Sequence, residues 1–215
     1  HHYDGQLKKE RHMKNKFIAL LLTVCTVPAF AGTSGYLGYT SDYMYRGLSQ
    51  SNGQGALQAS LKYETEGGLY GGIWASEVDF GDEATYELDF YGGYVMKLSD
   101  KLSVDVGVKQ INWDKGYDDV EEAFVKVNLK GVSFAYNVVM GNSDQKYMQV
   151  GYTLPFIDWA DVSLMYGRFD ENNDFGMVTV GKMLNDHVWV RLEVMDGARQ
   201  GQFMDMSNLG MYYHF

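Results

Sequence analysis

The feature that most constrains this chain is a repeated alternation of apolar and polar residues in short segments separated by turn residues. Side chains of a β-strand point alternately to its two faces, so each segment would present one apolar and one polar face. The pattern predicts an all-β protein. We count about twelve such segments, near 35–47, 56–66, 69–78, 85–97, 101–112, 120–130, 132–141, 146–154, 161–169, 175–184, 187–196 and 206–215.

The alternation is clear within individual segments. In residues 101–108, Leu or Val occupies every second position, and in 187–194 the apolar positions alternate with Arg191 and Glu193. Alternation alone leaves two architectures open. A soluble barrel of the lipocalin type would turn the apolar face inward, whereas a membrane barrel would turn it toward lipid and place the charges in the lumen.

The last segment favours the membrane barrel. Bacterial outer-membrane barrels close with a strand that ends in an aromatic residue, which the barrel-assembly machinery reads as an assembly signal. Here Leu209, Met211, Tyr213 and Phe215 share one face of such a strand. The chain also has 17 tyrosines for interfacial girdles. We therefore expect a transmembrane up-and-down antiparallel β-barrel of about twelve strands, a monomer surrounded by outer-membrane lipid.

The segment 13–31 has the features of a cleavable signal peptide. Met13 is followed by two lysines, a stretch of about ten apolar residues and an Ala-x-Ala site at Ala29–Ala31, and the apolar stretch is too short for a membrane helix. We expect the mature barrel to span 32–215 and residues 1–12 to be untranslated or artificial. A lipoprotein anchored at Cys25 is the alternative, but Val24 is too bulky for the position before a lipidated cysteine.

Removal of residues 1–31 leaves 13 basic and 26 acidic residues, a net charge of −13, and no cysteine. Such a chain needs no disulfide in the oxidising periplasm. Its charge disfavours nucleic acid as a partner and favours cations. Many carboxylates fall in the expected outer loops, namely Asp79, Asp82, Glu83, Asp114, Asp118, Asp119, Asp170, Glu171 and Asp174.

The connections between segments alternate in kind. If the N-terminus lies in the periplasm, the odd connections are longer and acidic or glycine-rich, at 49–55, 79–84, 113–119, 142–145, 170–174 and 197–205. The even ones, such as 67–68 and 99–100, are mostly tight. Long outer loops and short periplasmic turns are typical of outer-membrane barrels.

Four motifs in the first half resemble one known family. They are Ser41-Asp42-Tyr43-Met44-Tyr45-Arg46-Gly47-Leu48-Ser49-Gln50-Ser51, followed by 68–76, 87–94 and 105–108. These segments are similar to the TorF family, a group of bacterial outer-membrane proteins assigned as porins mainly by inference. Gly55 stands where that family often has proline, and the second half of the chain is similar only in rhythm. The resemblance implies an outer-membrane barrel with a porin-like role.

The polar faces of the segments supply candidate pore-lining residues. They are Asp42, Arg46, Lys62, Glu64, Glu87, Asp89, Asp105, Lys109, Arg191 and Glu193, with Glu122 and Lys126 placed to share the lumen. On one strand Asp42 and Arg46 would lie about 13 Å apart, too far to pair directly. Two interpretations stay open: a selective constriction that passes small hydrophilic solutes or cations, or an ion network that holds a closed barrel together. In the latter case the role would be structural or surface interaction.

An enzymatic role is not expected. The mature chain has two histidines, His187 and His214, both predicted at the periplasmic end and away from outer-surface substrates. The stretch 170–176 is similar to a calcium loop, but its glycine is displaced by one place and position twelve would be Gly181 instead of a carboxylate. No cofactor or metal is expected. Trp74 is assigned a packing role, although its face could be lumenal.

Overall fold

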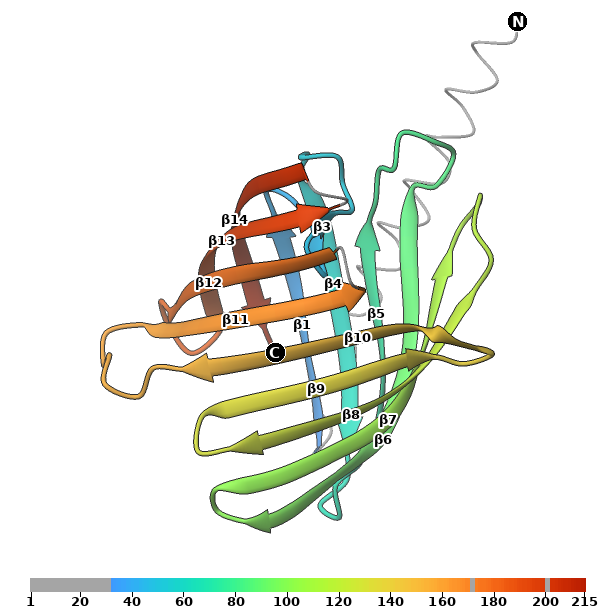
Figure 1. The fold of residues 1–215 in the computed structure, drawn as a ribbon. Helices are drawn as coiled ribbons and strands as arrows, with labels where there is room; N and C mark the ends of the chain where they lie inside the picture. Colours follow the sequence, from blue (N-terminus) through green and yellow to red (C-terminus); the bar gives the residue numbers. More distant parts are fainter. Residues whose placement is uncertain (1–31, 171–172, 200–201) are drawn as a thin grey trace, which may run out of the picture.

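The computed structural model describes residues 32–170, 173–199 and 202–215, and the predicted signal peptide and residues 1–12 lie outside them. Twelve antiparallel strands form a closed barrel, in the order β1-β14-β13-β12-β11-β10-β9-β8-β7-β6-β5-β4 (Figure 1). The predicted all-β class, strand number and antiparallel barrel are confirmed. In the described part of the chain, no helix is long and apolar enough to cross a membrane.

The barrel strands are β1 (Thr33–Thr40), β4 (Ala56–Glu64), β5 (Leu69–Glu77), β6 (Tyr86–Ser99), β7 (Leu102–Trp113), β8 (Val120–Leu129), β9 (Val132–Val139), β10 (Asn142–Thr153), β11 (Asp161–Asp170), β12 (Asn173–Met183), β13 (Val188–Arg199) and β14 (Gln202–His214). Each pairs with its neighbours in sequence, and β1 also pairs with β14, which closes the sheet. A separate two-stranded sheet joins β2 (Met44–Tyr45) to β3 (Leu48–Ser49).

Both described chain ends lie at one end of the barrel, which we call the terminal end, together with the turns 65–68, 100–101, 130–131, 154–160 and 184–187. The opposite end, which we call the loop end, carries the connections 41–55, 78–85 and 114–119, of which the first two are longer than any at the terminal end. At the seam, the backbone N–H of Phe215 donates to Gly35 O, and the N–H of Gly35 donates to Phe215 O, both at 3.1 Å.

The outer face of the barrel is apolar. Leu209, Met211 and Tyr213 are 60, 58 and 49 % exposed, whereas Glu87 and Glu193 are 3 and 7 % exposed. Val106, Val108, Leu192 and Val194 are exposed like the residues of the last strand. Because the apolar side chains point out and the charged ones point in, the barrel has the inside-out pattern of a membrane protein and not that of a lipocalin-type barrel.

Two sets of predicted boundaries are wrong. The first strand ends at Thr40 and not at residue 47. The backbone N–H of Ser41 donates to Leu209 O, and the Ser41 hydroxyl accepts a hydrogen bond from the N–H of Leu209. Beyond Ser41 the chain leaves the barrel wall. Residues 142–145, expected in a loop, belong to β10, which is irregular between Asn142 and Lys146. Three further ranges that were expected in loops lie in strands, namely 173–174, 197–199 and 202–205. Pairing of β12 with β13 and of β13 with β14 continues beyond the residues that alternate between apolar and polar.

Candidate functional site in the barrel lumen

The connection between β1 and β4, residues 41–55, folds inward as a β-hairpin, which we call the lumen hairpin. Its two short strands are joined by Arg46 and Gly47, with φ of 48° and 84°. Positive φ at both central residues is the requirement of a type I′ turn, which matches the twist of a tight hairpin. Glycine adopts this conformation freely, whereas Arg46 must be held in it by its contacts.

Side chains near the wall fix the base of the lumen hairpin. The Asp42 carboxylate accepts hydrogen bonds from the hydroxyls of Ser49 at 2.6 Å and Ser51 at 3.0 Å. The backbone N–H of Gln50 donates to Tyr43 O at 2.6 Å. Asp42 therefore stabilises the hairpin. The sequence pattern predicts that Asp42 and Arg46 lie on one face of a strand, and this prediction is wrong.

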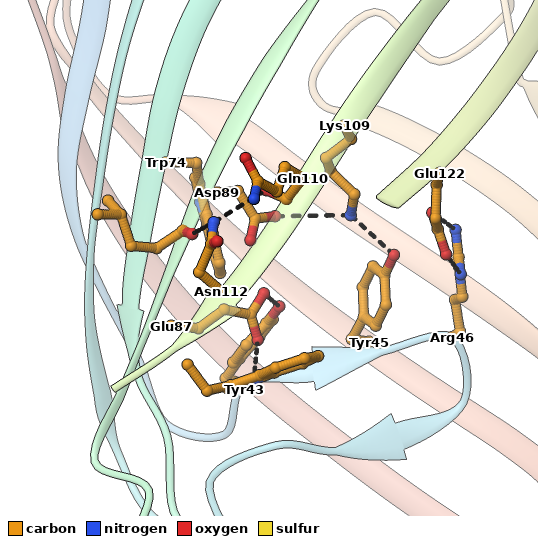
Figure 2. A network of polar contacts seen from close by, with 12 residues as sticks. Tyr43, Tyr45, Arg46, Trp74, Glu87, Asp89, Lys109, Gln110, Asn112 and Glu122 are labelled. Carbon is orange, nitrogen blue, oxygen red and sulfur yellow. Dashed lines mark hydrogen bonds and ion pairs between the residues drawn. The ribbon is translucent and has the colours of Figure 1, made fainter. Parts of the chain in front are cut away.

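The tip of the lumen hairpin reaches the opposite wall (Figure 2). Arg46 donates two hydrogen bonds to Glu122 of β8, Nη1 to Oε1 at 2.6 Å and Nη2 to Oε2 at 2.7 Å. Its guanidinium carbon lies 4.7 Å from the ring centre of Tyr45 and 4.4 Å from that of Tyr147. A bidentate pair of this kind is strong and directional, so it fixes the hairpin across the lumen.

Further contacts connect the middle of the hairpin to β6 and β7 (Figure 2). The Tyr45 hydroxyl accepts a hydrogen bond from Lys109 Nζ at 2.9 Å, and the same ammonium lies 3.5 Å from the Asp89 carboxylate. The Tyr43 hydroxyl donates to Glu87 at 3.3 Å. Burial, together with the neighbouring Glu87 charge, raises the pKa of Tyr43 well above its ordinary value. Tyr43 therefore remains a protonated donor at neutral pH.

The lumen hairpin separates two cavities. The loop-end chamber has a volume of about 290 Å³ and the terminal-end chamber about 340 Å³. Both are lined by Tyr45, Arg46, Gly47 and Phe175. A side chain at Gly47 would meet the Phe175 ring at 2.8 Å, so the hairpin tip is packed directly against β12. The partition between the chambers is thus made by the hairpin tip and the wall that it touches.

The other predicted lumen residues lie on β4, β7 and β13. Lys62 pairs with Glu64 at 2.5 Å, Arg191 pairs with Glu193 at 3.4 Å, and Asp105 accepts a hydrogen bond from the Tyr70 hydroxyl at 2.7 Å. Trp74 lines a lumenal cavity and donates to the Tyr36 hydroxyl at 2.7 Å. The charges therefore form several separate pairs along the lumen and not one ring.

Sequence reasoning missed the aromatic and sulfur-containing wall of the lumen. Tyr147, Phe175 and Met195 form a buried cluster with the partly buried Met44, Met165, Phe169, Met177 and Met206. The wall residues of this cluster occupy inward positions where the alternation predicts polar side chains, and Met44 of the hairpin packs against the cluster. The pair Arg46-Gly47 was a usable indication of a turn, since glycine commonly occupies the second central position of a two-residue hairpin loop.

The described residues show no group of three or more His, Cys, Asp or Glu side chains able to hold a metal. The interior is instead a set of hydrogen-bonded ion pairs and aromatic rings around several cavities.

Comparison with solved structures relates this architecture to porins. The KdgM porin, solved in complex with disordered oligogalacturonate, is similar with a TM-score of 0.64 at 8 % sequence identity, over 85 % of this chain and 99 % of that one. The NanC porin is similar with a TM-score of 0.50 at 11 % identity, over 85 % and 97 % of the two chains. At such identities the likeness establishes the fold alone.

Sequence comparison gives the family. Among curated proteins, no sequence matches this chain. A family model described as "Bacterial protein of unknown function (Gcw_chp)" matches residues 29–207, which includes the lumen hairpin and eleven complete barrel strands. This chain belongs to the Gcw_chp family of bacterial proteins.

Proposed function

We propose that this protein is a porin-like channel of the bacterial outer membrane, through which small hydrophilic solutes or cations pass passively. The observation that carries the proposal is the pair of cavities on either side of the lumen hairpin, inside a barrel whose outer face is apolar. The fold shared with the KdgM and NanC porins and the resemblance of residues 41–51 to the TorF family support it. The lumen hairpin would be the constriction.

A closed barrel with a structural or surface-interaction role is the second candidate. It is favoured by the Arg46–Glu122 pair, whose side chains are only 10 and 3 % exposed, and by the ring packing at the hairpin tip. Buried ion pairs can fix one conformation without contributing to transport. In this candidate the hairpin would be a permanent plug.

Conductance in a planar lipid bilayer separates the two candidates. A channel should give discrete current steps that increase with salt concentration after insertion of the refolded barrel. Detergent alone and unfolded protein serve as controls. A barrel that inserts, as shown by protease protection and heat-modifiable gel mobility, but passes no current would exclude the channel and leave the closed barrel.

We also propose that export removes residues 1–31. Protein isolated from outer membranes should then begin at Gly32 and carry no lipid. Intact-mass analysis checks this directly. A retained leader, or a mass that requires acylation of Cys25, would contradict the proposed processing.

Deletion of Phe215 should reduce the amount of folded barrel in the outer membrane severalfold. The deletion removes both backbone hydrogen bonds to Gly35 at the seam, and the aromatic residue that, with Leu209, Met211 and Tyr213, we propose as the recognition element for the barrel-assembly machinery. The measurement is the heat-modifiable gel band in membrane fractions. Replacement by Tyr is the matched control, since it keeps the ring and the backbone. Equal yields of the deletion variant and the wild type would refute the assignment.

A further inference from the structure

We propose that the loop-end chamber is a binding site for a small organic cation, an ammonium or guanidinium compound. The proposal deepens the proposed function, because it names a class of solute that would enter from the loop end. Binding itself requires only the folded barrel and not a conducting pore, so the two ideas can be tested separately.

Aromatic rings form much of the chamber wall. Tyr45 of the hairpin, Trp113 of β7, Phe169 of β11 and Phe175 of β12 all line it. The faces of such rings attract cations, most strongly where water is excluded. The cavity of about 290 Å³ is close to the lower end of the usual range for small-molecule sites, roughly 300 Å³ and more. Its size and lining suit a compact cation that has an apolar surface.

Glu87 supplies a carboxyl group to the chamber. Its two carboxylate oxygens accept hydrogen bonds from neutral donors, Tyr43 at 3.3 Å and Trp113 Nε1 at 3.1 Å. Neighbouring carboxylates differ, because Asp89 lies beside Lys109 and Glu122 is paired with Arg46. Within the described residues Glu87 has no cationic group within 4.0 Å. The carboxyl group is therefore held in orientation and has no counter-ion of its own, and a bound cation would supply one.

The barrel already holds two of its own cations in this way. The guanidinium of Arg46 lies between the rings of Tyr45 and Tyr147 and is paired with Glu122. The ammonium of Lys109 lies 4.8 Å from the centre of the Tyr45 ring and is paired with Asp89. The loop-end chamber is lined by the same two kinds of group, aromatic rings and a carboxyl group.

The remaining lining distinguishes an organic cation from a metal ion. Ile111, Val120, Val139 and Leu48 are apolar lining residues. They cannot replace the hydration shell of a small inorganic cation, whereas they can contact the methyl or methylene groups of an organic one. Acidic residues of the loop-end connections, including Asp82 and Glu83, would raise the local concentration of any cation at the entrance.

Calorimetric titration of the folded barrel in detergent micelles tests the proposal. The probes are choline and its uncharged isostere 3,3-dimethylbutan-1-ol, which has the same shape. We expect saturable binding of choline and none of the alcohol. Glu87→Gln should weaken choline binding by about tenfold or more, because it removes the carboxyl group that would pair with the ammonium. Phe169→Leu should weaken binding several-fold, because it removes one aromatic ring. Asp118→Asn, which removes one loop-end charge outside the chamber, should leave binding nearly unchanged.

Three outcomes would overturn the site. Equal binding of the alcohol would show a merely apolar pocket, and absence of choline binding at millimolar concentrations would exclude the ligand class. An effect of Asp118→Asn as large as that of Glu87→Gln would show general attraction at the mouth. Heat-modifiable mobility confirms that each variant is folded, and Phe169→Leu keeps the test valid if Glu87→Gln does not fold. Choline binding by a barrel without conductance would retain this site and refute the channel.

Discussion

Replacing Met44–Ser49 with Asn-Gly should increase single-channel conductance several-fold. The N–H of Gln50 already bonds to Tyr43 O, so the two ends of the deleted segment lie opposite each other and a two-residue type I′ turn can join them. The variant lacks Tyr45, Arg46 and Gly47, which line both chambers, and so unites the two cavities. Conductance in a planar bilayer is the measurement.

The control for this variant places the same two residues in a turn at the other end of the barrel. Replacing Asp100 and Lys101, the turn between β6 and β7, with Asn and Gly introduces the same turn without touching the lumen. Its conductance should equal that of the wild type. If the shortened hairpin conducts no better than this control, the lumen hairpin is not the constriction.

Neutralising Glu87 and Asp89 together, to Gln and Asn, should remove most of a preference for potassium over chloride. We expect the wild-type barrel to prefer cations, because carboxylates in a narrow passage of low dielectric are weakly screened. The double change also leaves Lys109, which lies 3.5 Å from Asp89, as an uncompensated positive charge beside Tyr45. The reversal potential under a potassium chloride gradient reports the preference.

The matched comparison neutralises two loop carboxylates, Asp118 and Asp119, to Asn. This variant changes the net charge by the same amount, but at exposed positions where salt screens the field. Its reversal potential should move much less and should depend more on salt concentration. Anion preference in the wild type, or equal shifts for the two pairs, would contradict the assignment of selectivity to the lumen.

The barrel itself was predictable because its pattern is repeated in every strand. Strands β4, β5, β7 and β8 differ from their predicted ranges by one or two residues. The outward orientation of the Leu209, Met211 and Tyr213 side chains follows from the alternation if the barrel lies in a membrane. Repetition makes such a prediction robust, since a single irregular segment does not change the strand count.

The lumen hairpin was not predictable by the same means. Alternation continues from β1 through Tyr43 and Tyr45, so a strand that bends into the lumen has the same pattern as one that continues in the wall. The partner of Arg46 is Glu122, 76 residues away, and their contact depends on which strands face each other across the closed barrel. The local sequence pattern does not indicate which residues face each other across the lumen, because closure of the sheet determines this.

The position of the lumen hairpin also has a consequence for the order of folding. It belongs to the connection between β1 and β4, beside the seam, yet its tip contacts Glu122 of β8, Tyr147 of β10 and Phe175 of β12. Strands β8, β10 and β12 surround the hairpin only after the sheet has curled. Contacts between residues far apart in sequence form late, because the chain must first lose conformational entropy. Docking of Arg46 should therefore be among the last steps of folding, so that the interior becomes rigid only in a barrel that has closed correctly.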